Sequence, residues 1–187
     1  MKTVLVPIAD GTEEIEAVTV IDVLRRAGAE VTVAAADRLQ VTASRGVKLV
    51  ADCLLTDCTD KDWDLVVVPG GIPGAEHLGR SRALEAILRA QAGAGRRYAA
   101  ICAAPAVVLQ PHGLLDGLKA TCHPGFADRL APLEIGPERV VVDGTCITSR
   151  GPGTALEFSL VLVRLLFGEA VARQVAEPML PHPAIDY

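Results

Sequence analysis

The hydrophobic positions divide the start of the chain into a strand, a helix and a second strand. Residues 3–9 form a nearly continuous apolar run, the pattern of a strand buried on both faces of a parallel sheet. From about Glu13 to Arg26, apolar side chains recur at the spacing of a helix that packs on a sheet. They are Ala17, Val20, Leu24 and Ala27. A strand is expected next over residues 30–35, so the chain opens with a βαβ unit.

The rest of the chain continues this alternation of short strands and amphipathic helices. Hairpins are expected over residues 41–52, at a sheet edge, and over residues 140–149, around an Asp143-Gly144 turn. Further strands are expected over 64–69, up to Cys102, and over 119–122. Helices are expected over 81–92, after Cys102, from a Thr154–Glu157 capping box onward, and over 169–176. The alternation predicts a three-layer α/β sandwich with a mostly parallel sheet, in a single domain over residues 1–187.

The strand that ends at Cys102 has the layout of a nucleophile elbow. Small residues, Ala100 and Ala104, flank the cysteine at minus two and plus two, as a sharp strand-to-helix turn requires. Alanine stands where the hydrolase version has glycine, and cysteine where it has serine. The first N–H groups of the next helix would favour the nucleophilic thiolate. A buried structural cysteine is the alternative, and this stretch alone does not choose between them.

Glu16 is a candidate acid–base residue. It lies one helical turn before Val20 and two before Leu24, so it borders the apolar stripe of the first helix. An inward carboxyl there would have a raised pKa, because burial disfavours the charged form. The alternative is an exposed first-turn acid that complements the positive end of the helix, the role expected of Glu13 and Glu14.

Two further candidates follow predicted strands. Gly70 and Gly71 come directly after the strand over 64–69, where glycines let the backbone approach a ligand and direct N–H groups toward it. Ligands of open α/β sheets bind at the carboxyl ends of strands, where Cys102 also lies. His123 follows the short strand over 119–122 and could orient or deprotonate Cys102, although a lone histidine is more often non-catalytic.

Composition argues against several function classes. The 187 residues include 18 Lys and Arg against 23 Asp and Glu, a net charge of -5, with 3% aromatic residues. This balance gives no electrostatic reason to bind nucleic acid or an acidic membrane. The N-terminus lacks the long apolar region of a signal peptide, and no apolar stretch reaches the length of a membrane span. We expect a cytoplasmic protein with no stable nucleic-acid complex and no membrane association.

The cysteines and glycines predict neither a metal site nor a cofactor. Five cysteines, an odd number at irregular spacings, are expected to be free thiols. Cys53 and Cys58 are too far apart for a C-x-x-C pair, and Cys122-His123 has no second ligand pair nearby. The loop at Gly11 is not G-x-G-x-x-G, which argues against dinucleotide binding.

Several of these segments together match one family. They are residues 11–18 (GTEEIEAV), 44–49 (SRGVKL), 68–71 (VPGG), 99–105 (AAICAAP) and 148–154 (TSRGPGT). In this order and spacing the chain resembles the ThiJ/PfpI superfamily, in the branch that contains DJ-one and YajL. The resemblance implies a flavodoxin-like fold and a homodimer.

The resemblance also implies roles for single residues. Cys102 matches the oxidation-sensitive nucleophile, and Glu16 the protonated glutamate that hydrogen-bonds its sulfur. The amides of Gly71 and Ala103 match an oxyanion-binding pair. His123 matches a histidine near the site, at a position that varies in this branch, and Arg150 matches a basic position near the site or the dimer interface.

The implied function is a cofactor-free enzyme that acts on small reactive carbonyls, such as glyoxal and methylglyoxal, and on early glycation adducts of proteins or nucleotides. A redox-sensing cysteine protein or chaperone is the alternative, since it would need the same activated sulfur. An amidase or peptidase is disfavoured, because Ala103 follows the nucleophile where the peptidase branch has histidine.

Overall fold

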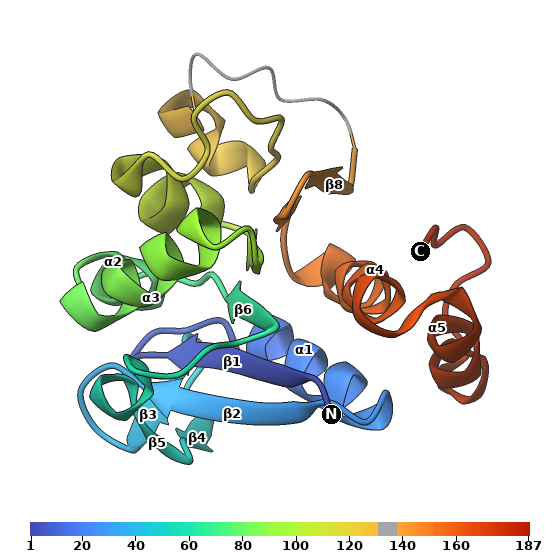
Figure 1. Cartoon of the computed structure of the whole chain (residues 1–187), viewed down its shortest axis with the longest axis horizontal. Coiled ribbons are helices and arrows are strands. Elements are labelled where there is room, and N and C mark those ends of the chain that lie inside the picture. The colour runs from blue at the N-terminus through green and yellow to red at the C-terminus, as the bar shows by residue number, and fades with distance from the viewer. Residues whose placement is uncertain (131–137) are drawn as a thin grey trace.

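The apolar runs of the sequence meet in one central sheet. The computed structural model describes residues 1–130 and 138–187, and its main sheet has the strand order β5-β2-β1-β6-β7-β9-β8 (Figure 1). All neighbours are parallel except β8, which is antiparallel to β9. The strands are β1 (Thr3–Ile8), β2 (Glu30–Ala35), β5 (Cys53–Leu54), β6 (Leu65–Val68), β7 (Arg97–Ile101), β8 (Val140–Asp143) and β9 (Cys146–Ser149).

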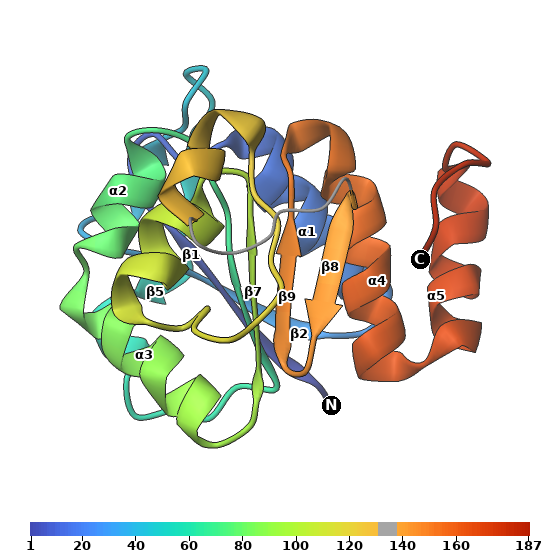
Figure 2. The same ribbon diagram turned by 90° about the horizontal axis from the view of Figure 1, so that it is seen from above.

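Helices cover both faces of this sheet (Figures 1 and 2). One face carries α1 (Glu14–Arg26) and α4 (Ala155–Phe167), with α5 (Glu169–Ala176) packed outside α4. The other face carries α2 (Gly74–Gly79), α3 (Arg82–Gly93) and the helical segment Pro105–Leu109. This is the flavodoxin-like, three-layer architecture with a mostly parallel sheet, so the prediction of fold class is confirmed.

The core lies between the sheet and these helices, as the periodicities require. Val4, Leu5 and Val6 of β1 are fully buried, since β1 lies in the interior of the sheet with helices on both sides. The predicted stripe of α1 packs inward, with Ala17, Val20 and Leu24 almost fully buried. The first βαβ unit therefore places the start of α1 beside the carboxyl ends of the central strands.

The predicted strand over residues 119–122 is wrong. This segment forms no ladder, because its N–H groups bind side chains of the β8–β9 hairpin in place of backbone carbonyls. The N–H of Lys119 donates to Asp143 Oδ2 at 2.8 Å, and that of Thr121 donates to Thr148 Oγ1 at 2.9 Å. The segment still runs along the sheet and delivers His123 to the end of β7 and β9.

The hairpin expected at the sheet edge is a separate unit. β3 (Gln40–Thr42) and β4 (Lys48–Val50) pair antiparallel in a two-stranded sheet of their own. The edge of the main sheet on this side is β5, a two-residue strand that the sequence pattern did not predict. It leads directly into η1 (Leu55–Cys58), a single 3₁₀ turn.

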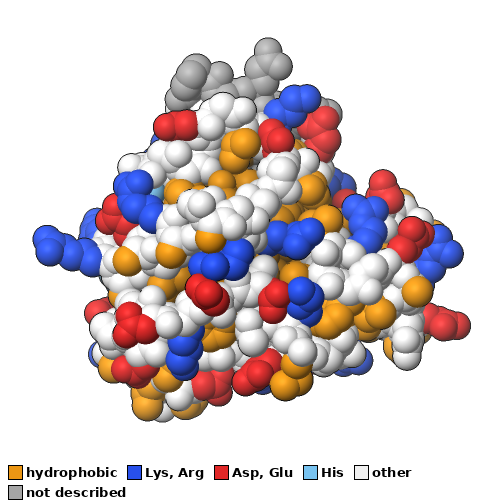
Figure 3. Space-filling model, in the orientation of Figure 1, with side chains coloured by type: hydrophobic (Ala, Val, Ile, Leu, Met, Phe, Trp, Pro, Cys, Tyr) orange, Lys and Arg blue, Asp and Glu red, His pale blue; other side chains and the backbone are white. Residues whose placement is uncertain are grey.

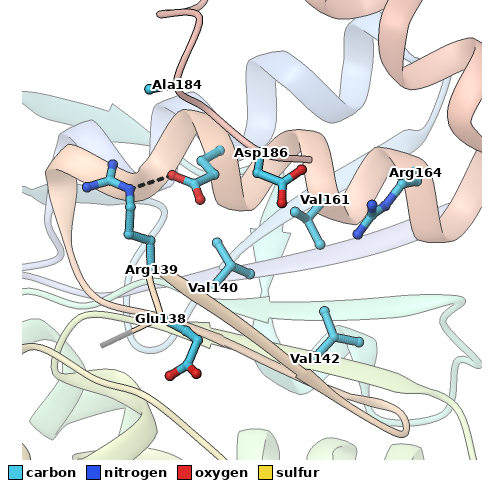
Figure 4. A pocket seen from close by; sticks show the side chains of 9 residues that line it. Glu138, Arg139, Val140, Val142, Val161, Arg164, Ala184 and Asp186 are labelled. Atoms are coloured by element: carbon cyan, nitrogen blue, oxygen red, sulfur yellow. Dashed lines mark hydrogen bonds and ion pairs between the residues drawn. The ribbon is translucent and has the colours of Figure 1, made fainter. Parts of the chain in front are cut away.

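The capping box expected at the start of α4 is also wrong, because both side chains bind elsewhere. The Thr154 hydroxyl donates to the Gly151 carbonyl at 2.9 Å. The Glu157 carboxylate accepts a hydrogen bond from Arg139 Nε at 2.6 Å, drawn as the dashed line in Figure 4. The predicted helix itself is present.

The surface mixes both signs of charge. On the face drawn in Figure 3, Lys and Arg side chains are interspersed with Asp and Glu. Within residues 1–130 and 138–187, no helix combines the length and hydropathy needed to cross a bilayer. The same residues contain no cluster of three or more His, Cys, Asp or Glu side chains that could hold a metal ion. All five cysteines are free thiols, as expected.

Candidate active site at the Cys102 elbow

The turn at Cys102 has the sharp geometry predicted for an elbow. Cys102 has a φ of 65°, a left-handed conformation that is uncommon for residues other than glycine. Its N–H donates to the Ser149 carbonyl at 3.0 Å, and its carbonyl accepts from the His123 N–H at 2.8 Å. The end of β9 and the segment before His123 therefore hold both backbone groups of the strained residue in place.

Glycine is required at position 70 because the loop after β6 packs directly on this turn. A Cβ on Gly70 would lie 2.6 Å from Cys102 Cβ and 2.9 Å from Glu16 Oε2. Both distances are shorter than any ordinary contact, so a side chain there would separate the loop from the nucleophile. The Gly70 carbonyl in turn accepts from the Glu13 N–H at 2.9 Å, which joins this loop to the start of α1.

Glu16 is the inward carboxyl that the sequence indicated. Its side chain is fully buried, and Oε2 accepts a hydrogen bond from the Gly70 N–H at 2.8 Å. Oε1 is buried and accepts no hydrogen bond from the described residues. Burial raises the pKa of Glu16 to about 7, against the opposing effects of the Gly70 N–H and the neighbouring Cys102 thiol. The carboxyl is thus protonated in a large fraction of molecules at neutral pH.

The sulfur of Cys102 lies among Glu16 and two backbone amides. The residue is 9% exposed, and the N–H groups of Gly71 and Ala103 favour its thiolate. The elbow layout predicts a donor after the cysteine, such as Ala103, and the family resemblance implies both donors. Burial outweighs these donors, and together with the charge of Glu16 it raises the pKa of Cys102 to about 12. The net effect is a raised pKa with burial as its largest cause, so the expectation that the elbow favours the thiolate is wrong overall. Protonation of Glu16 removes that repulsion and adds a donor beside the sulfur.

His123 reaches the elbow through its backbone. Its side chain is exposed, Nδ1 accepts from the Gly125 N–H at 3.1 Å, and the ring meets Phe126 edge-on with centroids 6.2 Å apart. The contacts that set the pKa of Cys102 come from Glu16, Gly71 and Ala103. A catalytic role for His123 stays a prediction.

Arg150 lies next to the residue that anchors the elbow, since it follows Ser149 at the end of β9. Burial raises the pKa of Cys122 to about 11, against the lowering effect of the Arg150 charge. This places the guanidinium near Cys122; that Arg150 binds substrate at the site, as the family match implies, stays a prediction.

Sequence reasoning missed the contacts that hold the start of α1. The Ser44 hydroxyl lies 2.7 Å from Glu13 Oε2 and 2.8 Å from Glu14 Oε2, and the Arg45 N–H donates to Glu14 Oε1 at 2.9 Å. Glu13 and Glu14 are accordingly buried, beyond the surface role expected of them. Segment 44–49 was already among the segments that carried the family resemblance. Nothing in its sequence indicated that it contacts the start of α1.

A separate hollow of about 410 Å³ lies beside the edge strand β8 and the helix α4 (Figure 4). None of the site residues predicted from the sequence lines it. Its lining consists of Glu138, Arg139, Val140, Val142, Glu157, Val161, Arg164, Ala184 and Asp186.

Comparison with known proteins identifies the family to which this site belongs. The family model described as DJ-1/PfpI matches residues 2–165. The chain belongs to the DJ-1/PfpI family. One relative, Protein DJ-1 homolog B of Arabidopsis thaliana, is 49% identical over 190 residues, which is all of this chain but 43% of that protein. The chain thus spans less than half the length of this plant relative.

Two other DJ-1/PfpI relatives match over nearly their whole length. The solved structure of oxidized Toxoplasma gondii DJ-1 has a TM-score of 0.94 at 46% identity, covering 96% of this chain and 98% of that one. The glutathione-independent glyoxalase DJR-1.2 of Caenorhabditis elegans is 34% identical over 178 residues, 94% of either chain. The resemblance read from the sequence segments is confirmed at the level of family and fold.

Proposed function

We propose that the protein is a cofactor-free enzyme that converts reactive 2-oxoaldehydes, such as glyoxal and methylglyoxal, into hydroxy acids. The observation that carries this proposal is the pairing of a buried carboxyl of pKa about 7, Glu16, with the Cys102 sulfur and two amide donors. The relative DJR-1.2, named a glutathione-independent glyoxalase, supports the same reaction class.

The first step is addition of the Cys102 sulfur to the aldehyde carbon. Protonated Glu16 favours the thiolate at this stage, and the new carbon–sulfur bond places negative charge on the former aldehyde oxygen. The N–H groups of Gly71 and Ala103, which already point at the sulfur, stabilise that oxyanion by roughly 3 kcal/mol per donor. The oxyanion takes up the Glu16 proton, which gives a hemithioacetal and leaves Glu16 ionised.

The second step moves a proton between neighbouring carbons. Ionised Glu16 removes the proton from the carbon bonded to sulfur, which gives an enediol, and returns a proton to the adjacent carbon. The product is a thioester, and water releases it as the hydroxy acid with the thiol regenerated. One carbon is oxidised while its neighbour is reduced, so the reaction needs no external redox partner.

The test is turnover of glyoxal to glycolate, followed by NMR with the purified protein. Wild type should convert glyoxal, whereas Cys102→Ser and Glu16→Gln should lose at least 100-fold in kcat/KM, in the range of general acid–base catalysis. Cys53→Ser, at the far edge strand β5, is the matched control and should keep full activity. Unchanged rates in either site variant would contradict the mechanism.

Early glycation adducts are a second proposed substrate class for the same sulfur. Hemithioacetals and aminocarbinols on proteins or nucleotides present the same carbon oxidation state as free 2-oxoaldehydes. Release of a preformed adduct should be faster with wild type than with Cys102→Ser while a scavenger removes free glyoxal. Equal release rates would restrict the activity to the free aldehyde.

A redox-sensing role of Cys102 is the second candidate function, favoured by the match to a DJ-1 structure described as oxidized. Peroxide would convert the sulfur stepwise to a sulfinate, and protonated Glu16 beside it could donate a hydrogen bond to an added oxygen. Intact-mass analysis after graded peroxide should show selective addition of two oxygens at Cys102. Unselective oxidation of all five cysteines would argue against sensing.

We also propose that the protein is a homodimer through α1 and the β3–β4 hairpin. Ile15 and Val18 on α1 and Val47 and Val50 of the hairpin region are large apolar side chains that are 46–69% exposed. The Ser44 hydroxyl contacts the Glu13 and Glu14 carboxylates, so the loop of this hairpin lies against the start of α1. Light scattering should give twice the mass of the chain, and Val50→Glu should reduce it to the monomer.

A further inference from the structure

Two cysteines away from the elbow lie in contact. Cys53 belongs to the edge strand β5, and Cys58 is the last residue of η1. Their sulfur atoms are 3.5 Å apart, although the sequence spacing had argued against a redox pair. The reason is local: β5 leads straight into one 3₁₀ turn, which brings the chain back over its own start.

The two thiols differ in access to solvent. Cys53 is partly exposed, whereas Cys58 is fully buried. Burial and the adjacent Cys53 raise the pKa of Cys58 to about 12, so this thiol stays protonated and does not react first. An oxidant from solvent can therefore reach one sulfur of the pair, while the other is held beside it as a resolving thiol.

This pair is separate from the proposed active site. Three strands, β2, β1 and β6, lie between β5 and the strand β7 that ends at the Cys102 elbow. Four strand spacings amount to about 19 Å, so neither thiol of the pair can form a disulfide with Cys102 in the folded protein.

We propose that Cys53 and Cys58 form a second redox site, which a hydroperoxide closes to an intramolecular disulfide independently of Cys102. In the first step the Cys53 sulfur takes one oxygen from hydrogen peroxide, which gives a sulfenic acid and one water. The Cys58 sulfur then attacks the Cys53 sulfur, and the hydroxyl leaves as a second water with the Cys58 proton. Two electrons pass from the two thiols to the peroxide.

The closure is small and has a structural consequence. The sulfur atoms must approach from 3.5 Å to the bonded distance of about 2.05 Å, a movement of about 1.5 Å. η1 packs against α3 and β2, so the disulfide would fasten this turn to the edge of the main sheet. An external dithiol would reopen it by exchange.

Peptide mass analysis tests this proposal directly. Trypsin releases residues 49–61 as one peptide that holds Cys53, Cys58 and no other cysteine. After peroxide and alkylation of the folded Cys102→Ser protein, this peptide should be two hydrogen masses lighter than the reduced form and carry no alkyl group. Dithiothreitol should restore two alkylatable thiols.

Single variants test the assignment of the two roles. In Cys58→Ala the Cys53 sulfenic acid should persist and react with dimedone, whereas in Cys53→Ser the buried Cys58 should stay reduced. Two free thiols in the wild-type peptide, at peroxide doses that oxidise Cys102, would overturn the proposal. So would equal oxidation of Cys58 with and without Cys53. Glyoxal turnover is measured in parallel, because failure of either proposal leaves the other intact.

Discussion

Ionisation of Glu16 should cost the folded protein stability, and Glu16→Gln should remove that cost. Burial raises the pKa of Glu16 from 4.5 to about 7. In the unfolded chain the carboxyl loses its proton near its ordinary value, while the folded protein holds the proton until about pH 7. The unfolded state thus binds fewer protons in this window, so stability falls as pH rises through it.

The size of the effect follows from the pKa difference. A rise from 4.5 to about 7 corresponds to roughly 3 kcal/mol, of which about 2.5 kcal/mol is lost between about pH 5 and pH 8. The full value applies without solvent screening, because the Glu16 side chain has no exposed surface. Glutamine keeps the shape and can still accept from the Gly70 N–H, but it cannot ionise.

The assay is urea unfolding of wild type and Glu16→Gln at several pH values between about 5 and 8. The difference between the two proteins cancels the other titrating groups. The variant should gain about 2.5 kcal/mol relative to wild type across this range. A difference that does not vary with pH would refute the raised pKa, and with it the proton transfer assigned to Glu16.

Glu14→Gln is the matched control on the same helix, with the opposite sign. Burial raises the pKa of Glu14, but hydrogen bonds from its own N–H, Ser44, Arg45 and Val47 outweigh burial and lower the pKa overall. A lowered pKa contributes stability above the ordinary value of 4.5, and this stability is lost as pH falls through the folded pKa. Glu14→Gln should therefore lose stability relative to wild type at neutral pH, with a smaller loss in acid.

Two further predictions concern the packing of the site and of α4. Gly70→Ala should lower stability by about 1–3 kcal/mol and abolish glyoxal turnover, because its Cβ would overlap the Cys102 side chain; urea unfolding measures the first effect. Gly93→Ala, whose Cβ would meet nothing within 4 Å, should change neither property for the worse. Arg139→Ala should cost about 1–3 kcal/mol in the same assay, since it leaves the buried Glu157 carboxylate without its 2.6 Å partner; an unchanged midpoint would show that water replaces the arginine.

The sequence predicted those parts of the fold that depend on local periodicity. The apolar run of β1 and the stripe of α1 are read directly, and the stripe also located Glu16, because inward orientation follows from helical spacing alone. The strand expected over residues 119–122 failed because its N–H partners, Asp143 and Thr148, are more than twenty residues away along the chain. No local pattern carries that information.

The sequence predicted the direction of the pKa shift of Glu16, but not that of Cys102. Burial dominates at Glu16 and at Cys102, and burial of a single side chain is the sum of contacts from several elements. The elbow layout indicated a donor after Cys102, and the family resemblance implied the Gly71 donor, but neither gave a measure of the opposing desolvation. The contact between Cys53 and Cys58 was missed for a related reason, since β5 and η1 are too short to leave a periodic pattern.

The proposed chemistry depends on Glu16 and Cys102 acting as one unit. Ionised Glu16 raises the pKa of Cys102 through its charge, whereas protonated Glu16 lacks that charge and can donate to the sulfur. Addition to the aldehyde requires the protonated carboxyl, and removal of the carbon-bound proton requires the ionised one. A carboxyl of ordinary pKa would be ionised in nearly all molecules at neutral pH, so the Cys102 thiolate would form rarely. A carboxyl that stayed protonated in all molecules could not act as a base. A pKa of about 7, which burial produces against the opposing Gly70 N–H, makes both forms available at neutral pH. Glycine at position 70 keeps the two groups close, because a Cβ there would clash with both Cys102 and Glu16.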